Sequence, residues 1–197
     1  MLAVALGGAY AAEAFWAVAE GLATPWEAWV GPRPDRMVLA VGGRYAPWTV
    51  SAPWRLVTSW FVHIDLAHLL VNLVAAVALP RAGGDRLSGR AWVVTFGLAG
   101  LAGGLLGDAL GVVRSAGASG GLHGWLALLA VEPGLRGPVV ASAILSVATS
   151  LFVPAIDVGA HVGGVVVGLL AAAWLSAGVG RDGAGADDGA SPPTEGR

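Results

Sequence analysis

Long apolar stretches between isolated charges are the feature that most constrains this sequence. Four of them hold no charged residue at all, and they cover residues 92–107, 115–131, 137–156 and 158–180. Two more, residues 2–22 and 56–79, are interrupted only by Glu13 and Glu20 and by Asp65, respectively. About 20 mostly apolar residues are needed to cross the hydrocarbon core of a bilayer. The sequence therefore predicts an all-α membrane protein with six spans.

Composition favours a single membrane domain. Hydrophobic residues make up 56% and charged residues 12% of the 197 residues, whereas about 25% of the residues in soluble domains are charged. We expect one six-span domain over residues 1–180. Its first stretch lacks the preceding basic residues of a secretory signal and is interpreted as a span. Residues 181–197 are too poor in apolar side chains to form a core, so we expect a disordered polar tail.

The connectors indicate how the chain lies in the membrane. The first connector, residues 23–55, holds Trp26, Trp29, Trp48 and Trp54. Tryptophan rings prefer the headgroup level, so we expect this connector to lie against the membrane and to contain short helices. Three Arg residues in the connector at 80–90 favour its cytoplasmic placement. We expect an integral multi-pass protein, surrounded by lipid in a bacterial cell (inner) membrane, with both termini in the cytoplasm.

Charge and cysteine content argue against several functions. The formal net charge is only −2, and the eleven basic residues are scattered singly, so no basic stripe is available for a nucleic acid. Cysteine is absent, which excludes disulfides, thiolate catalysis and cysteine-ligated metals. We expect no nucleic-acid partner, no metal and no cofactor.

Few side chains that could take part in catalysis or binding lie within the predicted spans. Such groups are costly at membrane depth and usually face the bundle interior or a wet cavity, so each is a candidate site residue. They are His63, His68 and Asn72 in the second span, Ser119 and His123 in the fourth, and His161 in the sixth.

Ser119 lies in the glycine-rich segment Gly117-Ala118-Ser119-Gly120-Gly121. We expect small neighbours to expose its hydroxyl at the start of a helix, where backbone N–H groups are free to bind an anion. A serine hydroxyl is a weak nucleophile without a base, and His161 is the candidate base. The glycines that follow it, at 163, 164 and 168, would let the two helices pack closely.

His68 and Asn72 are four residues apart, so they share one helix face. We expect these two donors to stabilise an oxyanion, a role in which one donor contributes roughly 2.7–4 kcal/mol. His63 is rotated away from them, towards the outer end of the span. We interpret it as a structural or gate-side residue.

Together these motifs resemble those of the rhomboid family of intramembrane serine proteases. The ordered set is Trp54-Arg55, His63 with His68 and Asn72, Gly117-Ala118-Ser119-Gly120, and Ala160-His161 followed by Gly164 and Gly168. Asp85-Arg86 matches an acidic-Arg connector of the family. The resemblance covers about residues 42–175 and implies a six-helix rhomboid-like bundle.

The resemblance implies a serine endopeptidase with a Ser119–His161 dyad and no acidic third member. His68, Asn72 and the backbone N–H of Ser119 match the oxyanion-stabilising positions, Gly117 and Gly120 flank the nucleophile, and His63 matches a histidine near the mouth of the site. The implied substrate is a single-span membrane protein that enters sideways and is cut near its outer membrane boundary.

One residue departs from the family pattern. The position four after the nucleophile is usually aromatic and packs on the catalytic histidine, and here it is His123. Its Leu122-His123-Gly124 run resembles that of rhombosortases, which process carboxy-terminal sorting signals. We favour a packing role for His123 over proton exchange.

Other polar residues have structural interpretations. Asp157 lies four residues before His161 and is either a triad carboxylate or a helix N-cap, and we favour the cap. Ser142, Ser146, Thr149 and Ser150 are expected only to bond the carbonyl of the preceding turn. We interpret Arg55 as an interfacial structural residue.

Two other protein classes remain as alternatives. One is a rhomboid pseudoprotease that binds membrane helices without cutting them, although this chain keeps both the serine and the histidine. The other is a small transporter, but the ionisable groups gather at one end of three spans rather than tracing a path through the membrane.

Overall fold

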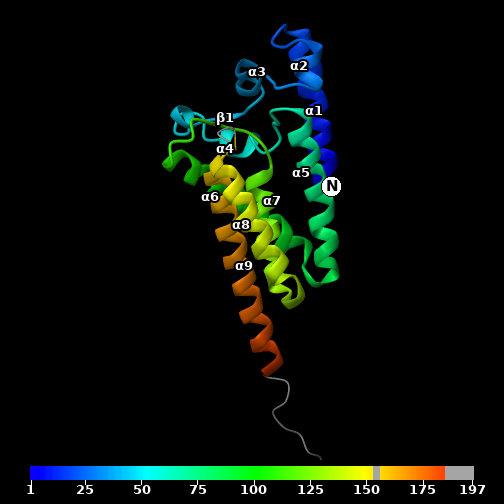
Figure 1. Cartoon of the computed structure of the whole chain (residues 1–197), viewed down its shortest axis with the longest axis vertical. Coiled ribbons are helices and arrows are strands. Elements are labelled where there is room, and N and C mark those ends of the chain that lie inside the picture. The colour runs from blue at the N-terminus through cyan, green and yellow to red at the C-terminus, as the bar shows by residue number, and fades with distance from the viewer. Residues whose placement is uncertain (153–155, 185–197) are drawn as a thin grey trace, which may run out of the picture.

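The computed structural model describes residues 1–152 and 156–184, and most of them are helical (Figure 1). The longer helices are α1 (Leu2–Ala19), α5 (Leu66–Gly83), α6 (Gly89–Ala109), α7 (Ser119–Leu128), α8 (Arg136–Phe152) and α9 (Val158–Ala184). The shorter elements are α2 (Pro25–Trp29), α3 (Asp35–Ala40), α4 (Arg55–Thr58), η1 (Ala46–Trp48), η2 (Gly84–Arg86), η3 (Leu129–Val131), η4 (Pro133–Leu135) and the strands β1 (Arg44–Tyr45) and β2 (Arg114–Ser115). Residues 185–197 of the predicted tail lie outside the described residues.

The described helices confirm an all-α membrane bundle. Five segments are long and apolar enough to cross a membrane: Leu2–Ala19, Leu66–Gly83, Gly89–Ala109, Pro133–Leu151 and Val158–Ala177. The fourth predicted span corresponds to a shorter apolar helix, Ser119–Val131. Most of α7 within it is buried. Other helices therefore pack around α7.

The second span begins at Leu66 rather than at Leu56. The Asp65 side chain accepts a hydrogen bond from the His68 N–H at 2.7 Å and caps α5 there. Residues 55–58 form the separate helix α4, and the chain turns between the two. An apolar run indicates membrane depth, but it does not indicate where the backbone changes direction.

The first connector contains the short helices that we predicted. Thr24 and Glu27 form a capping box at the start of α2, and α3 and α4 follow. Strand β1 of the connector pairs antiparallel with β2, which joins the connector to the loop before α7. Trp26 and Trp54 are well exposed, as a segment against the membrane surface requires. Its membrane contact stays a prediction.

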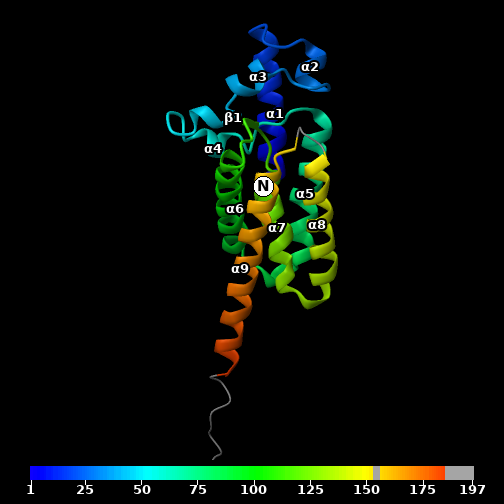
Figure 2. The ribbon, with the colours of Figure 1, turned by 60° about the vertical axis from the view of Figure 1, so that its left-hand side comes forward.

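Glycine brings α6, α7 and α9 into close contact. These three helices lie side by side along the bundle, with α9 extending past the others at the end opposite the first connector (Figures 1 and 2). A Cβ on Gly103 of α6 would lie 2.6 Å from the carbonyl oxygen of Ala160, and a Cβ on Gly164 would overlap the carbonyl of Gly120. Small residues therefore set the distance between the helices that carry Ser119 and His161.

Candidate active site

One cavity of about 1260 Å³ brings most of the sequence-predicted residues together. Its walls come from α5, α7, α8, α9, the loop before α7 and part of the first connector, including α3. The predicted residues among its lining are His68, Asn72, Ser119, His123 and His161. Among the described residues, no group of three His, Asp or Glu side chains is placed to hold a metal ion.

Ser119 is the first residue of α7, as the glycine-rich segment predicted. The preceding Gly117 has φ +123°, a conformation that favours glycine, and its N–H donates to the Ser59 carbonyl at 2.8 Å. A Cβ on Gly117 would lie 2.5 Å from Cε1 of His68. Glycine is thus needed at position 117 for two reasons: the backbone turns there with a positive φ, and the His68 imidazole occupies the space that a Cβ would fill.

His161 lies in the first turns of α9, next to the helix that starts at Ser119. A Cβ on Gly120 would lie 3.3 Å from the carbonyl oxygen of Ala160, so the immediate neighbours of the two residues approach closely. In the described part of the chain, no hydrogen bond joins Ser119 to His161. Nδ1 of His161 instead lies 2.7 Å from the Ser150 hydroxyl on α8.

His123 stacks on His161, as expected of a packing residue. The ring centroids are 3.9 Å apart and the ring planes differ by 21°. Hydrogen bonds hold the ring on both sides, because Nδ1 lies 2.7 Å from the Ser119 carbonyl oxygen and Nε2 lies 2.6 Å from the Ser146 hydroxyl. The hydrogen bonds of Ser146 and Ser150 to these imidazoles correct our expectation that both serines bond only the preceding turn.

The predicted oxyanion pair lies on the face of α5 that lines the cavity. The Asn72 amide donates to the His68 carbonyl oxygen at 3.1 Å, and Asn72 is almost fully buried. Nδ1 of His68 is buried with no hydrogen-bond partner in the described residues. Both side chains line the cavity, and His68 lies against Gly117 in the loop that precedes Ser119.

Asp157 caps α9, which confirms the interpretation that we favoured over a triad. Its Oδ1 accepts a hydrogen bond from the Ala160 N–H at 2.9 Å, and its Oδ2 accepts one from Nη2 of Arg44 at 2.5 Å. Arg44 also forms an ion pair with Asp108 at the end of α6. Sequence reasoning missed this buried Arg44. The available signal was an arginine in the connector together with aspartates at two helix boundaries.

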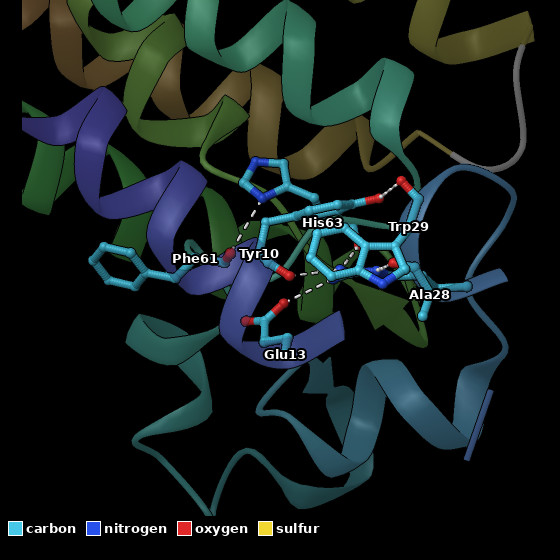
Figure 3. Close-up of polar contacts among 7 residues, drawn as sticks. Tyr10, Glu13, Ala28, Trp29, Phe61 and His63 are labelled. Carbon is cyan, nitrogen blue, oxygen red and sulfur yellow. Dashed lines mark hydrogen bonds and ion pairs between the residues drawn. The ribbon is translucent and has the colours of Figure 1, made fainter. Parts of the chain in front are cut away.

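His63 is not among the residues that line the cavity; it belongs to a buried cluster around Arg33, which itself reaches the cavity wall. The Arg33 guanidinium donates to the carbonyl oxygens of Tyr10 and His63 at 3.0 and 3.3 Å and pairs with Glu13 at 2.8 Å. His63 Nδ1 lies 3.2 Å from the Phe61 carbonyl (Figure 3). Burial lowers the pKa of His63 to about 3, which keeps the ring neutral. The cluster ties α1 to the first connector, consistent with a structural role.

Arg55 is also structural, as we expected. Its Nη1 donates to the carbonyl oxygens of Leu39 and Gly43 at 2.7 and 2.8 Å. The guanidinium lies 5.0 Å from the centre of the Trp48 ring. These contacts hold the turns of the first connector together, so the side chain is not free to clamp a substrate.

The fold and site define a class: a multi-pass helical membrane protein with serine, histidine and amide side chains around a cavity between its helices. A family model for the Rhomboid domain matches residues 50–178. The chain therefore belongs to the rhomboid family, whose members are generally intramembrane serine proteases. A search of curated protein sequences found no match. The matched region includes all the predicted site residues.

Proposed function

We propose that this protein is an intramembrane serine endopeptidase in which Ser119 is the nucleophile and His161 its general base. The observation that carries the proposal is the position of both residues on one cavity, on two helices held together by glycine. Family membership supports the same assignment. Formation of the Ser119–His161 hydrogen bond on substrate binding is part of the proposal, since catalytic hydrogen bonds often tighten only then.

The proposed reaction is an acyl transfer in two steps. His161 Nε2 takes the proton of the Ser119 hydroxyl while Oγ bonds to the carbonyl carbon of the scissile peptide. The tetrahedral intermediate collapses, the C–N bond breaks, and His161 gives its proton to the leaving amine. Water then attacks the acyl ester with His161 as base again, which releases the carboxylate product and restores the Ser119 hydroxyl.

Hydrogen-bond donors beside Ser119 support stabilisation of the oxyanion. The N–H groups at the start of α7 have no side-chain cap, and a helix N-terminus favours negative charge. The Asn72 amide and the His68 imidazole approach from α5. We assign these three groups to the oxyanion, and Gly117 to the close approach of His68.

The cavity walls support a membrane-spanning substrate. Along α5 the lining continues from His68 to Val71, Ala75 and Leu79, and Val71 is largely exposed. These apolar side chains face the cavity from the helix surface that lipid or another helix would cover. We propose a single-span membrane protein as the substrate and a bacterial inner membrane as the location, with both termini in the cytoplasm.

The experiment that tests the dyad is labelling with a fluorophosphonate serine probe in detergent. We expect the wild type to be labelled, Ser119→Ala to be unlabelled, and His161→Ala to react more slowly by orders of magnitude. Ser176→Ala is the matched control, because Ser176 is on the same helix as His161 and, among the described residues, its hydroxyl bonds the Ala172 carbonyl and no other group. Equal labelling of the wild type, Ser119→Ala and His161→Ala would reject the protease.

A second experiment tests the substrate class. Cleavage of a single-span reporter, with and without a Gly-Gly carboxy-terminal signal, separates a general rhomboid protease from rhombosortase-type processing, which the Leu122-His123-Gly124 run resembles. A reporter that co-purifies with the wild type but is never cut would favour a pseudoprotease.

A further inference from the structure

Two serines of α8 reach the stacked imidazoles from one side. Ser146 and Ser150 lie one turn apart, and their hydroxyls lie 2.6 Å from His123 Nε2 and 2.7 Å from His161 Nδ1. We infer that Ser150 is a positioning residue that fixes the tautomer of His161 and leaves Nε2 free as the base. The inference rests on the proposed function for its catalytic meaning, but the hydrogen-bond directions are assigned from distances that do not depend on that function.

The direction at Ser150 follows from its single proton. Its Oγ lies 2.8 Å from the Ser146 carbonyl oxygen, and a carbonyl can only accept, so the hydroxyl proton is used there. With its proton in that hydrogen bond Ser150 accepts from His161, and we therefore assign a proton to Nδ1. A neutral imidazole carries one proton, so Nε2 of His161 holds a lone pair.

The same reasoning fixes His123. Its Nδ1 lies 2.7 Å from the Ser119 carbonyl oxygen, which can only accept, so Nδ1 is protonated. Nε2 must then accept from the Ser146 hydroxyl at 2.6 Å. The hydrogen bonds of both rings thus have one direction each, and they connect α8 to the backbone of the nucleophile.

Burial makes this arrangement effective. Ser150 and His161 are 5% and 8% exposed, so water offers no ready alternative partner to Nδ1. When Nε2 receives the proton of Ser119, Nδ1 keeps its hydrogen bond to Ser150 and no group has to turn. Ser150 therefore does what the carboxylate of a triad does for orientation, but as a neutral acceptor. The position of α8 thereby controls whether the base is correctly protonated.

The test compares Ser150→Val with Ser150→Thr, which have the same shape and differ in the hydroxyl. Thr149→Val is the matched control, because Thr149 bonds the Leu145 carbonyl in the same way but is exposed and reaches no histidine. Nitrogen-15 NMR of the His161 ring reports the tautomer, and the rate of fluorophosphonate labelling reports the base. Thermal unfolding in detergent confirms that each variant is folded.

We expect Nδ1–H in the wild type, Ser150→Thr and Thr149→Val, and a growing Nε2–H population in Ser150→Val. The labelling rate of Ser150→Val should fall about tenfold or more, since a buried donor loses its acceptor. An Nε2–H tautomer in the wild type, or equal rates for the Val and Thr variants, would overturn the inference. If the wild type resists labelling but shows Nδ1–H that is lost in Ser150→Val, the protease proposal fails while the positioning role stands.

Discussion

The ring of His123 combines two contacts whose contributions can be separated by substitution. It stacks on His161 with 3.9 Å between centroids and it hydrogen-bonds Ser119 and Ser146. Aromatic pairs contribute about 0.5–1.5 kcal/mol beyond the area they bury. Stacking requires only a flat ring, whereas the hydrogen bonds require both nitrogens.

His123→Phe should therefore keep the stack and lose the hydrogen bonds, and His123→Ala should lose both. We expect labelling by the fluorophosphonate probe to fall several-fold in the Phe variant and further in the Ala variant. His123→Ala should also unfold about 2–3 kcal/mol more easily than the wild type, because a cavity is left in the packed centre. Equal rates for the two variants would show that the stack contributes nothing to the base.

The role of a single residue could be predicted from the sequence where its sequence neighbours determine that role. The cap formed by Asp157 follows from an Asp just before an apolar run, and the start of α7 at Ser119 from the glycine cluster. The contact of Ser150 with His161 was not predictable, because it depends on how α8 is rotated about its axis against α9. A serine that bonds its preceding turn looks the same in sequence whether or not it has a second partner.

The apolar runs predicted most of the long helices, but they did not predict where those helices begin and end. The length of α7 illustrates the reason: a charge-free run of 17 residues at 115–131 predicted a full span, but its first four residues form strand and turn. Ser115 pairs in β2, and Gly117 bonds Ser59. Tertiary partners of the backbone thus shortened a segment whose hydropathy alone indicated a longer helix.

The contact between α7 and α9 predicts that a larger side chain at Gly164 separates the two helices. A Cβ on Gly164 would overlap the Gly120 carbonyl and lie 3.0 Å from the His123 Cβ. Gly164→Ala should therefore push α9 away from α7 and destabilise the fold by about 1–3 kcal/mol. Labelling of Ser119 should fall together with stability, because the same contact sets the distance from His161 to the nucleophile.

Gly97→Ala on α6 is the control for this substitution. No atom lies within 4 Å of a Cβ built there, apart from its own helix and neighbours. Replacing glycine by alanine in an unhindered helix should stabilise it by up to about 1 kcal/mol. Unfolding by heat or denaturant in detergent measures both variants. The close-contact explanation requires opposite signs, and a Gly164→Ala variant as stable as Gly97→Ala would contradict it.

The whole molecule depends on contacts between segments far apart in the sequence. The first connector meets the ends of two spanning helices through Arg44, which pairs with Asp108 in the last turn of α6 and with Asp157 before α9. The bundle was predictable because lipid forces backbone groups into helices. This ion cluster was not, since nothing local pairs residue 44 with residue 157.

Arg44 and Arg114 are a matched pair for testing how far the fold depends on the buried Arg44 ion pairs, because they lie on the two paired strands β1 and β2. Arg44 is 2% exposed, and its removal would leave two aspartates without their cation. Breaking a buried ion pair by losing one partner costs about 3–5 kcal/mol. Arg114 pairs with Asp35, and both side chains are more than half exposed, so its ion pair should contribute less than about 1 kcal/mol.

We therefore expect Arg44→Gln to lower the unfolding temperature markedly and Arg114→Gln to leave it almost unchanged. Because Asp157 starts the helix that carries His161, Arg44→Gln should also slow labelling of Ser119. Adding Asp108→Asn and Asp157→Asn to Arg44→Gln should recover much of the lost stability, since the amides need no cation and Asn still caps a helix. If the triple variant were no more stable than Arg44→Gln alone, uncompensated charge would not be the cause. The guanidinium would then act mainly by filling space between the connector and the two helices.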